Sequence, residues 1–292
     1  MHVGFIGLGM MGGGMSSNLL KAGHTVSGFD LSPASMERHA KAGGIVAKSA
    51  KEAVKDADVI FTMLPNGPDV EHVLLGPDGV AAHIKPGAVI VDSSTILPKA
   101  TDSIAARLKA MGVAMVDAPI GRTSEHAWAG TLIFMVGGEK AHFEKVLPLL
   151  EVMGEVTYHC GPVGTGIRTK IINNYMSIVL NVLTAEALTL SEKFALDRDT
   201  LIKVLMGTPA GRSHLTTSYP AKVFKNDVTA TFMLDLAAKD LGLAIQAGAA
   251  EGVPLATGAA AQQIYNIAQS HGHGKEDWTA MLVNMRELAG LK

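Results

Sequence analysis

A lysine and several small polar residues share one face of an otherwise apolar segment near the middle of the chain. The helical spacing i, i+3, i+4, i+7 and i+11 is occupied by Lys170, Asn173, Asn174, Ser177 and Asn181. Isoleucines flank the lysine on both following positions, which indicates a buried helix, and burial lowers the pKa of an amine towards neutrality. This pattern predicts acid–base chemistry with Lys170 as the proton donor, the alternative being an exposed surface lysine.

A glycine-rich turn near the N-terminus has the spacing of a dinucleotide-binding site. Gly7 would allow a tight turn, Gly9 a close backbone approach to a pyrophosphate, and Gly12 close packing of a helix on a strand. The helix N-terminus after the turn would face the phosphates. The predicted cofactor-binding residues of this turn are Gly7, Leu8, Gly9, Met10, Met11 and Gly12.

An aspartate closes the next apolar run. Asp30 follows Gly12 by 18 residues, the spacing at which a carboxylate accepts hydrogen bonds from the adenosine ribose. The same charge would repel a 2′-phosphate, so the sequence predicts NAD(H) rather than NADP(H). The alternative is an aspartate that only caps the turn before Pro33.

Composition indicates a globular protein that acts on small molecules. The 292 residues suffice for two domains, and a formal net charge of −2 with 18% charged residues gives no basic footprint for nucleic acid. The single cysteine fits a reducing compartment. Polar residues interrupt the apolar stretch 171–190, so we expect no membrane span, and the N-terminus lacks the pattern of a signal peptide. These features predict a cytoplasmic protein.

Short apolar runs alternate with helical segments in the first half. The expected strands are 2–7, 25–29, 59–63, 88–92, 114–117 and 132–136, and the expected helices are 10–21, 32–41, 68–74 and 98–111. This alternation predicts an α/β, Rossmann-type domain over residues 1–162, with a parallel sheet covered on both faces. Residues 163–292 are predicted to form an all-α domain that begins with a long helix from near Ile167, buried between domains or subunits.

The order of these motifs resembles the β-hydroxyacid dehydrogenase family, which includes 3-hydroxyisobutyrate dehydrogenase. Family-like blocks occur along nearly the whole chain, at 7–24, 62–66, 92–95, 117–119, 130–131, 136–138, 164–174 and 239–241. The resemblance implies a Rossmann-type domain, a long interdomain helix and a helical C-terminal domain, assembled as a homodimer or homotetramer. No nucleic-acid or membrane partner is implied.

The resemblance also implies residue roles. It makes Lys170 the catalytic lysine and Asn174 a substrate-positioning residue beside it. Thr95 would lie where the nicotinamide meets the substrate. The further cofactor-binding residues that it implies are Leu64, Pro65, Asn66 and Lys239.

The sequence departs from the common family pattern at the substrate-anion site. Many members carry Ser-Gly-Gly there, whereas this chain has Gly121 followed by Arg122, Thr123 and Ser124. A guanidinium fork and two hydroxyls suit an anion with three oxygens, so a sulfonate is the natural candidate. Arg122 could instead pair with a surface carboxylate or bind a carboxylate substrate.

Family members that act on sulfonated aldehydes resemble this variant most. That resemblance places Ser177 around the substrate with Asn174, and Phe232 and Asp235 nearby. The prediction is an NADH-dependent reductase of a small sulfonated aldehyde. The alternatives are a reductase or dehydrogenase of a carboxylated semialdehyde or 3-hydroxyacid, and a catalytically silent NAD-binding sensor. The histidine pair at 271 and 273 fits a glycine-rich turn better than a metal loop, so no metal site is expected.

Overall fold

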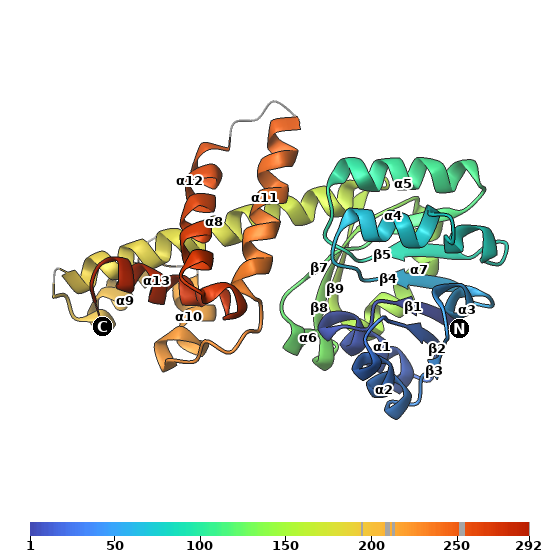
Figure 1. Ribbon diagram of the computed structural model, residues 1–292, viewed down its shortest axis with the longest axis horizontal. Helices are drawn as coiled ribbons and strands as arrows, with labels where there is room; N and C mark the ends of the chain where they lie inside the picture. The colour runs from blue at the N-terminus through green and yellow to red at the C-terminus, as the bar shows by residue number, and fades with distance from the viewer. Residues whose placement is uncertain (194, 208–210, 212–213, 251–254, 292) are drawn as a thin grey trace. The chain divides into compact units, whose positions relative to one another are not determined.

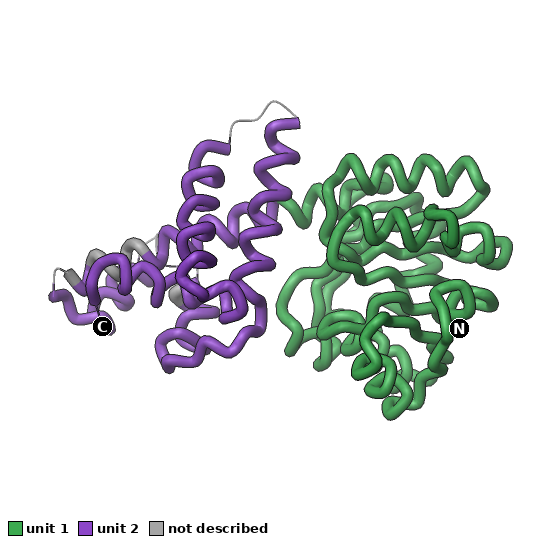
Figure 2. The backbone as a smooth tube through the Cα atoms, viewed as in Figure 1, with its two compact units in different colours: residues 1–171 green, residues 172–292 purple. Residues whose placement is uncertain are grey.

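The computed structural model describes residues 1–193, 195–207, 211, 214–250 and 255–291. The chain divides into two compact units, residues 1–171 and 172–292 (Figure 2). The division falls inside the long helix α8 (Thr165–Lys193), whereas the predicted domain boundary at 162/163 lies just before this helix begins.

Unit 1 is built on a nine-stranded sheet with the order β3-β2-β1-β4-β5-β6-β8-β7, and β9 pairs with β8. The strands β1 to β6 are parallel, as predicted, while β8 runs antiparallel to β6 and β7. The strand bounds are β1 His2–Ile6, β2 Thr25–Phe29, β3 Ile45–Val46, β4 Val59–Thr62, β5 Val89–Asp92, β6 Ala114–Asp117, β7 Ile120–Gly121, β8 Leu132–Gly137 and β9 Gly154–Gly161.

Helices cover both faces of this sheet (Figure 1). Alternate strand residues point to opposite faces, so Phe5 packs in one apolar cluster with α1 and α7, while Ile6 packs in another with α3, α4 and α5. This double burial explains why the strands are apolar at nearly every position. The helix bounds are α1 Met10–Lys21, α2 Pro33–Lys41, α3 Ala50–Val54, α4 Gly67–Leu75, α5 Pro98–Ala110, α6 Ser124–Ala129 and α7 Lys140–Met153.

Three strands of the sheet were not predicted. β3 and β7 have two residues each, too few for an alternating pattern. β9 is longer, but its side chains are half-buried or exposed along its whole length, so it lacks the apolar run that marks the central strands. Of the three strands beyond β6, only β8 was therefore predicted, as the strand 132–136.

Unit 2 is helical, as predicted. Its described residues contain no strand beyond an isolated bridge between Met233 and Asp277. The helices are the greater part of α8, then α9 Arg198–Met206, α10 Ser218–Ala221, α11 Leu234–Ala250, α12 Ala256–Ser270 and α13 Met281–Leu288. None of the helices in the described part of the chain combines the length and the hydropathy that a membrane span requires.

One face of α8 packs into the core of unit 2. Ile178 and Val182 lie in an apolar cluster that includes Tyr265 of α12. The opposite face of α8 is different, because Ile172, Met176 and Leu183 are exposed in the single chain. The predicted burial of this helix therefore holds, within the chain, for one face only.

Candidate active site

The predicted cofactor residues of unit 1 meet at one edge of the sheet. The strand ends are in register, with Ile6 opposite Phe29 and Thr62, and Thr62 opposite Asp92. The segments that follow these strands therefore emerge together at the carboxyl edge, beside the point where the strand order reverses between β1 and β4. In open α/β sheets this is where dinucleotides bind. The predicted cofactor residues that leave this edge are Gly7–Gly12, Asp30, Leu64–Asn66 and Thr95.

The glycine-rich turn has the geometry that its spacing predicts. Gly7 has a φ of +94°, and a Cβ atom on Gly12 would clash with the Gly7 carbonyl. A Cβ on Gly9 would meet no atom within 4 Å, and Gly9 precedes α1 without any side-chain cap. The backbone at Gly9 thus leaves room beside the N-terminus of α1, and no side chain caps that end of the helix, which fits a pyrophosphate.

Asp30 makes two backbone hydrogen bonds at this edge. Its Oδ2 accepts from the Leu8 N–H at 2.6 Å, and its Oδ1 accepts from the Ser32 N–H at 2.7 Å. The second contact is the turn cap that the sequence left open as an alternative. The first ties the carboxylate to the glycine-rich turn. Each carboxylate oxygen keeps a further lone pair for a ribose hydroxyl.

A buried carboxylate fixes the two neighbouring loops. Asp92 accepts from the Thr62 hydroxyl at 2.8 Å and from the Ser94 N–H at 3.1 Å, and the Ser94 hydroxyl in turn accepts from the Leu64 N–H at 2.9 Å. Burial raises the pKa of Asp92 to about 6. The network joins the loop of Leu64 to the loop of Thr95. Asp92 lies in one of the family-like blocks, 92–95, but no role was predicted for it.

Asn66 has a structural task in the same region. Its side chain accepts from the Asp69 N–H at 2.9 Å and so caps the N-terminus of α4. This cap orients the loop that leaves β4. It does not test the predicted contact of Asn66 with the cofactor.

The helix of Lys170 is anchored to the sheet by Asp117. The Asp117 carboxylate, at the end of β6, accepts from the Gly164 N–H at 2.6 Å and from the Ile167 N–H at 2.7 Å. It thereby caps the N-terminus of α8. Burial raises the pKa of Asp117 to about 6, although both hydrogen bonds oppose the rise. Lys170 itself is half-buried and lies in the second turn of the helix.

Asn174, one helical turn beyond Lys170, contacts a buried carboxylate of α11. Asn174 is itself buried, and its Nδ2 donates to Asp240 Oδ2 at 2.6 Å. The Lys239 ammonium lies 2.9 Å from the other oxygen of Asp240. Two predicted site residues of unit 2 therefore share one buried carboxylate, which sequence reasoning missed although it follows Lys239 directly.

Asn181 belongs to the core of unit 2 instead. It is fully buried, and its Nδ2 donates to the Trp278 carbonyl at 2.9 Å and towards the Tyr265 hydroxyl at 3.4 Å. The predicted stripe is therefore not one continuous polar surface. Ser177 is half-buried, and its carbonyl accepts from His214 Nε2.

The turn between β7 and α6 holds the unusual anion-site residues. Arg122 has a φ of +80°, a conformation that favours glycine. Its Nη1 donates to the Thr131 carbonyl at 2.6 Å and to the Glu155 carboxylate. Thr123 Oγ1 lies 3.0 Å from His126 Nδ1, and Ser124 is buried at the start of α6. The pairing with a surface carboxylate that the sequence allowed is thus present.

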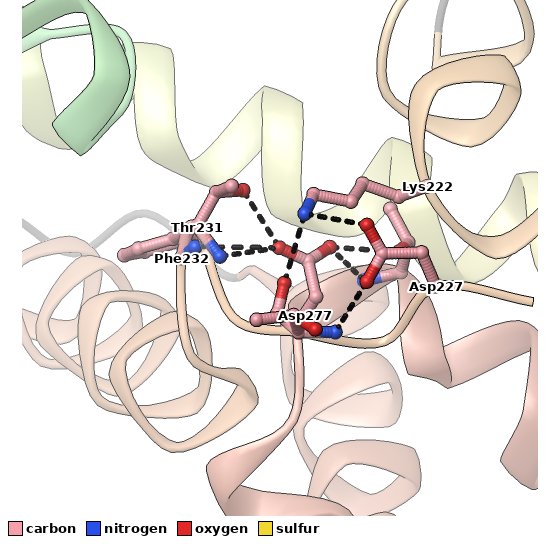
Figure 3. Close-up of polar contacts among 7 residues, drawn as sticks. Lys222, Asp227, Thr231, Phe232 and Asp277 are labelled. Atoms are coloured by element: carbon pink, nitrogen blue, oxygen red, sulfur yellow. Dashed lines mark hydrogen bonds and ion pairs between the residues drawn. The ribbon is translucent and has the colours of Figure 1, made fainter.

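A second buried aspartate of unit 2 fixes the segment of Phe232 (Figure 3). Asp277 is fully buried and accepts from the Thr231 N–H at 3.0 Å and the Thr231 hydroxyl at 2.7 Å. The Phe232 ring lies edge-on to the Trp278 ring, with 5.4 Å between the ring centroids. Asp235, at the start of α11, accepts from Gln269 at 2.8 Å and pairs with Lys275 at 3.0 Å, and these contacts lower its pKa. Both predicted substrate residues therefore have internal partners in unit 2.

The histidine pair before α13 forms internal contacts. His273 Nδ1 lies 2.7 Å from Glu276, and its Nε2 lies 3.1 Å from Glu287. His271 Nδ1 lies 3.0 Å from the side-chain oxygen of Asn284. In the described residues, no group of three or more His, Cys, Asp or Glu side chains is arranged to hold a metal ion.

Both units of the chain resemble parts of known dehydrogenases. Residues 2–161 match the model of the NAD-binding domain of 6-phosphogluconate dehydrogenase, and residues 164–285 match that of the NAD-binding region of NADP-dependent 3-hydroxyisobutyrate dehydrogenase. The 3-sulfolactaldehyde reductase of Escherichia coli K12 is 44% identical over 99% of this chain and 97% of that protein. The NAD-dependent L-serine dehydrogenase of Pseudomonas aeruginosa is 38% identical over 96% of each. A solved Mycobacterium tuberculosis 3-hydroxyisobutyrate dehydrogenase with L-serine has a TM-score of 0.91 and 36% identity, over 98% of this chain and 99% of that one.

The chain belongs to the β-hydroxyacid dehydrogenase family. It is an NAD-dependent oxidoreductase that acts on CH–OH groups, and the resemblance inferred from its motifs is confirmed. The predicted roles of the glycine-rich turn and of Asp30 in binding the pyrophosphate and ribose of the cofactor stay predictions. The residue roles predicted around the substrate stay predictions.

Proposed function

We propose that this β-hydroxyacid dehydrogenase reduces 3-sulfolactaldehyde to 2,3-dihydroxypropane-1-sulfonate with NADH. The observation that carries the proposal is Arg122, a large cation held at a φ of +80°, in the turn where the family resemblance leads us to expect Ser-Gly-Gly. A strained conformation of this kind costs of order 1 kcal/mol and persists where the side chain has a function. The 44% identity to a 3-sulfolactaldehyde reductase supports the same substrate.

The anion-site residues suit a sulfonate. Arg122 offers a planar fork of donors, and the hydroxyls of Thr123 and Ser124 follow it directly in the chain. A sulfonate has three equivalent oxygens, so it can accept from all three side chains. A carboxylate has only two oxygens, so one of these three side chains would have to donate its hydrogen bond to water.

Lys170 is the proposed general acid. The bound NADH supplies a hydride to the aldehyde carbon, while the Lys170 ammonium gives a proton to the carbonyl oxygen. Lys170 is then reprotonated from water. Asn174, one helical turn further along α8, is held by Asp240 and is proposed to orient the substrate hydroxyl.

We also propose that Asp30 selects NADH over NADPH. Its carboxylate is fixed by the Leu8 and Ser32 N–H groups, so it cannot turn away from a 2′-phosphate without losing both hydrogen bonds. The residues proposed to complete the cofactor site are Leu64, Pro65, Asn66, Thr95 and Lys239.

A carboxylated substrate is the second candidate. Relatives of 38% and 39% identity are named for L-serine and 2-(hydroxymethyl)glutarate, and arginine binds carboxylates as readily as sulfonates. The deciding experiment compares kcat/KM for sulfolactaldehyde, tartronate semialdehyde and succinate semialdehyde by NADH oxidation. A clear preference for sulfolactaldehyde supports the proposal, whereas a preference for tartronate semialdehyde returns the protein to the general semialdehyde reductases.

We propose that the protein is a cytoplasmic homodimer or homotetramer that acts in sulfoquinovose breakdown. The exposed side chains of Ile172, Met176 and Leu183 lie at i, i+4 and i+11, so they form one apolar stripe on α8. Such a stripe suits burial against a second copy of the chain. Light scattering of the purified protein gives the mass that tests this, and a monomer at micromolar concentration would contradict it.

A further inference from the structure

The guanidinium of Arg122 is already engaged on one nitrogen. Nη1 carries two N–H groups, and it has two acceptors, the Thr131 carbonyl at 2.6 Å and the Glu155 carboxylate. Both hydrogens of Nη1 are thus used inside unit 1. The Nε and Nη2 groups form the other edge of the guanidinium. This edge can bind an oxyanion with two parallel hydrogen bonds.

Glu155 reaches Arg122 because of a local irregularity in the sheet. Along the pair β8–β9, Leu132 is opposite Gly154 and Ile133 is opposite Val156, so Glu155 is the extra residue of a β-bulge. A bulge changes the direction of a side chain relative to regular pairing. Thr131, the other acceptor, immediately precedes β8. The ion pair therefore joins Arg122, which has a strained backbone, to Glu155, the extra residue of the β-bulge.

The ion pair also sets the local charge. A free guanidinium carries one positive charge, but with the Glu155 carboxylate in contact the formal charge of the pair is zero. An anion with a single charge can still be held by the hydrogen bonds of the free edge. A second negative charge on the ligand gains less from the pair than it would from an unpaired guanidinium, because the carboxylate offsets part of the attraction.

We propose that Glu155 is a specificity-determining residue, which fixes the Arg122 fork for a singly charged head group and disfavours a doubly charged one such as a phosphate. The proposal rests on the proposed function, because it needs the substrate anion on Arg122. It would let a site with three oxygen-binding side chains favour a sulfonated aldehyde over a phosphorylated one. Sulfonates and phosphates share a tetrahedral shape. A phosphate ester differs in its second negative charge and in the bridging oxygen, which places its head group one atom further from the aldehyde.

The test uses the full-length enzyme with NADH and two substrates, sulfolactaldehyde and glyceraldehyde 3-phosphate. In Glu155→Gln the ratio of kcat/KM should shift towards the phosphate by about tenfold at low salt, and less at high salt. Because the Glu155 side chain is 56% exposed, this variant should keep its fold. In the wild type, discrimination against the phosphate should weaken between pH 7.5 and 6, since the second phosphate pKa is about 6.

Two controls isolate the ion pair. Glu151→Gln removes an equal charge from the exposed surface of α7 and should leave the ratio unchanged. In an Arg122→Ala background, Glu155→Gln should no longer shift the ratio. An unchanged ratio in the single variant, or an equal shift in the Arg122→Ala background, would overturn the proposal.

Inhibition keeps this result separate from the identity of the substrate. The inhibition constants of 2,3-dihydroxypropane-1-sulfonate and glycerol 3-phosphate can be measured against any aldehyde that the enzyme reduces. If sulfolactaldehyde is not a substrate, the proposed function fails. A shift of the two inhibition constants in Glu155→Gln would then still support the role of Glu155, and no shift would refute it.

Discussion

The cap of α8 by Asp117 gives a prediction that joins stability to catalysis. Asp117→Ala removes both acceptors and leaves the Gly164 and Ile167 N–H groups buried without partners. Each buried donor left unpaired costs about 1–3 kcal/mol, so the expected loss is roughly 2–6 kcal/mol. Each kcal/mol lowers Tm by about 2–4 °C in a protein domain of this size, which predicts a fall of roughly 4–24 °C. Asp117→Asn keeps one acceptor oxygen and should lose about half as much.

Calorimetry and steady-state kinetics with NADH measure both effects. Since α8 carries Lys170 in its second turn, kcat should fall further than NADH affinity, which is proposed to depend mainly on the glycine-rich turn after β1 and on Asp30 after β2. Asp102→Asn is the matched control, because Asp102 also contacts the first turn of α8, through Arg168, but on the exposed surface. Exposed pairs contribute about 0–1 kcal/mol. If Asp117→Ala unfolded within about 0.5 kcal/mol of the wild type and kept its kcat, the anchoring role of Asp117 would be refuted.

Four further predictions concern single groups. Lys170→Ala should lower kcat by about 10²–10⁴-fold in NADH-oxidation assays and leave NADH affinity nearly unchanged, whereas more than a tenth of wild-type turnover would make Lys170 structural. NADPH should bind about 10- to 100-fold more weakly than NADH, and equal efficiency would contradict the role of Asp30. Arg122→Ala should lower kcat/KM for sulfolactaldehyde roughly 30- to 1000-fold, Arg122→Lys should recover only part of it, and neither should affect an uncharged aldehyde. Burial of His273 opposes its protonation, but the hydrogen bonds to Glu276 and Glu287 outweigh burial and raise its pKa above 6.5. The stabilisation is therefore complete below pH 6.5 and is lost as pH rises through the higher folded value, so Tm should fall with pH there in the wild type and less in His273→Gln.

The parts of the fold that sequence could predict are those governed by local pattern. The central strands are recognisable because Phe5, Phe61 and Val91 alternate with equally apolar neighbours that face the other side of the sheet. The glycine-rich turn is recognisable because Gly7 and Gly12 have fixed steric tasks at a fixed spacing. In both cases the physical requirement lies within a few consecutive residues.

The parts that could not be predicted depend on contacts between distant residues. Asp117 caps α8 by accepting from the N–H of Gly164, 47 residues later, and Asn174 finds its carboxylate partner 66 residues away. Asn181 has the helical spacing of a site residue, yet the fold places Tyr265 and Trp278 against it. No local signal distinguishes these outcomes, because the partner of a polar side chain is decided by the tertiary structure.

The left-handed backbone at Arg122 decides what a substitution there costs. Glycine adopts a φ of +80° without strain, so Arg122→Gly should relieve about 1–2 kcal/mol of backbone strain. The same change removes the contacts of the guanidinium with Thr131 and Glu155. Glycine codons of the form GGN and arginine codons of the form CGN differ by a single base. One base change at this position therefore exchanges a relaxed turn without a cation for a strained turn that carries one.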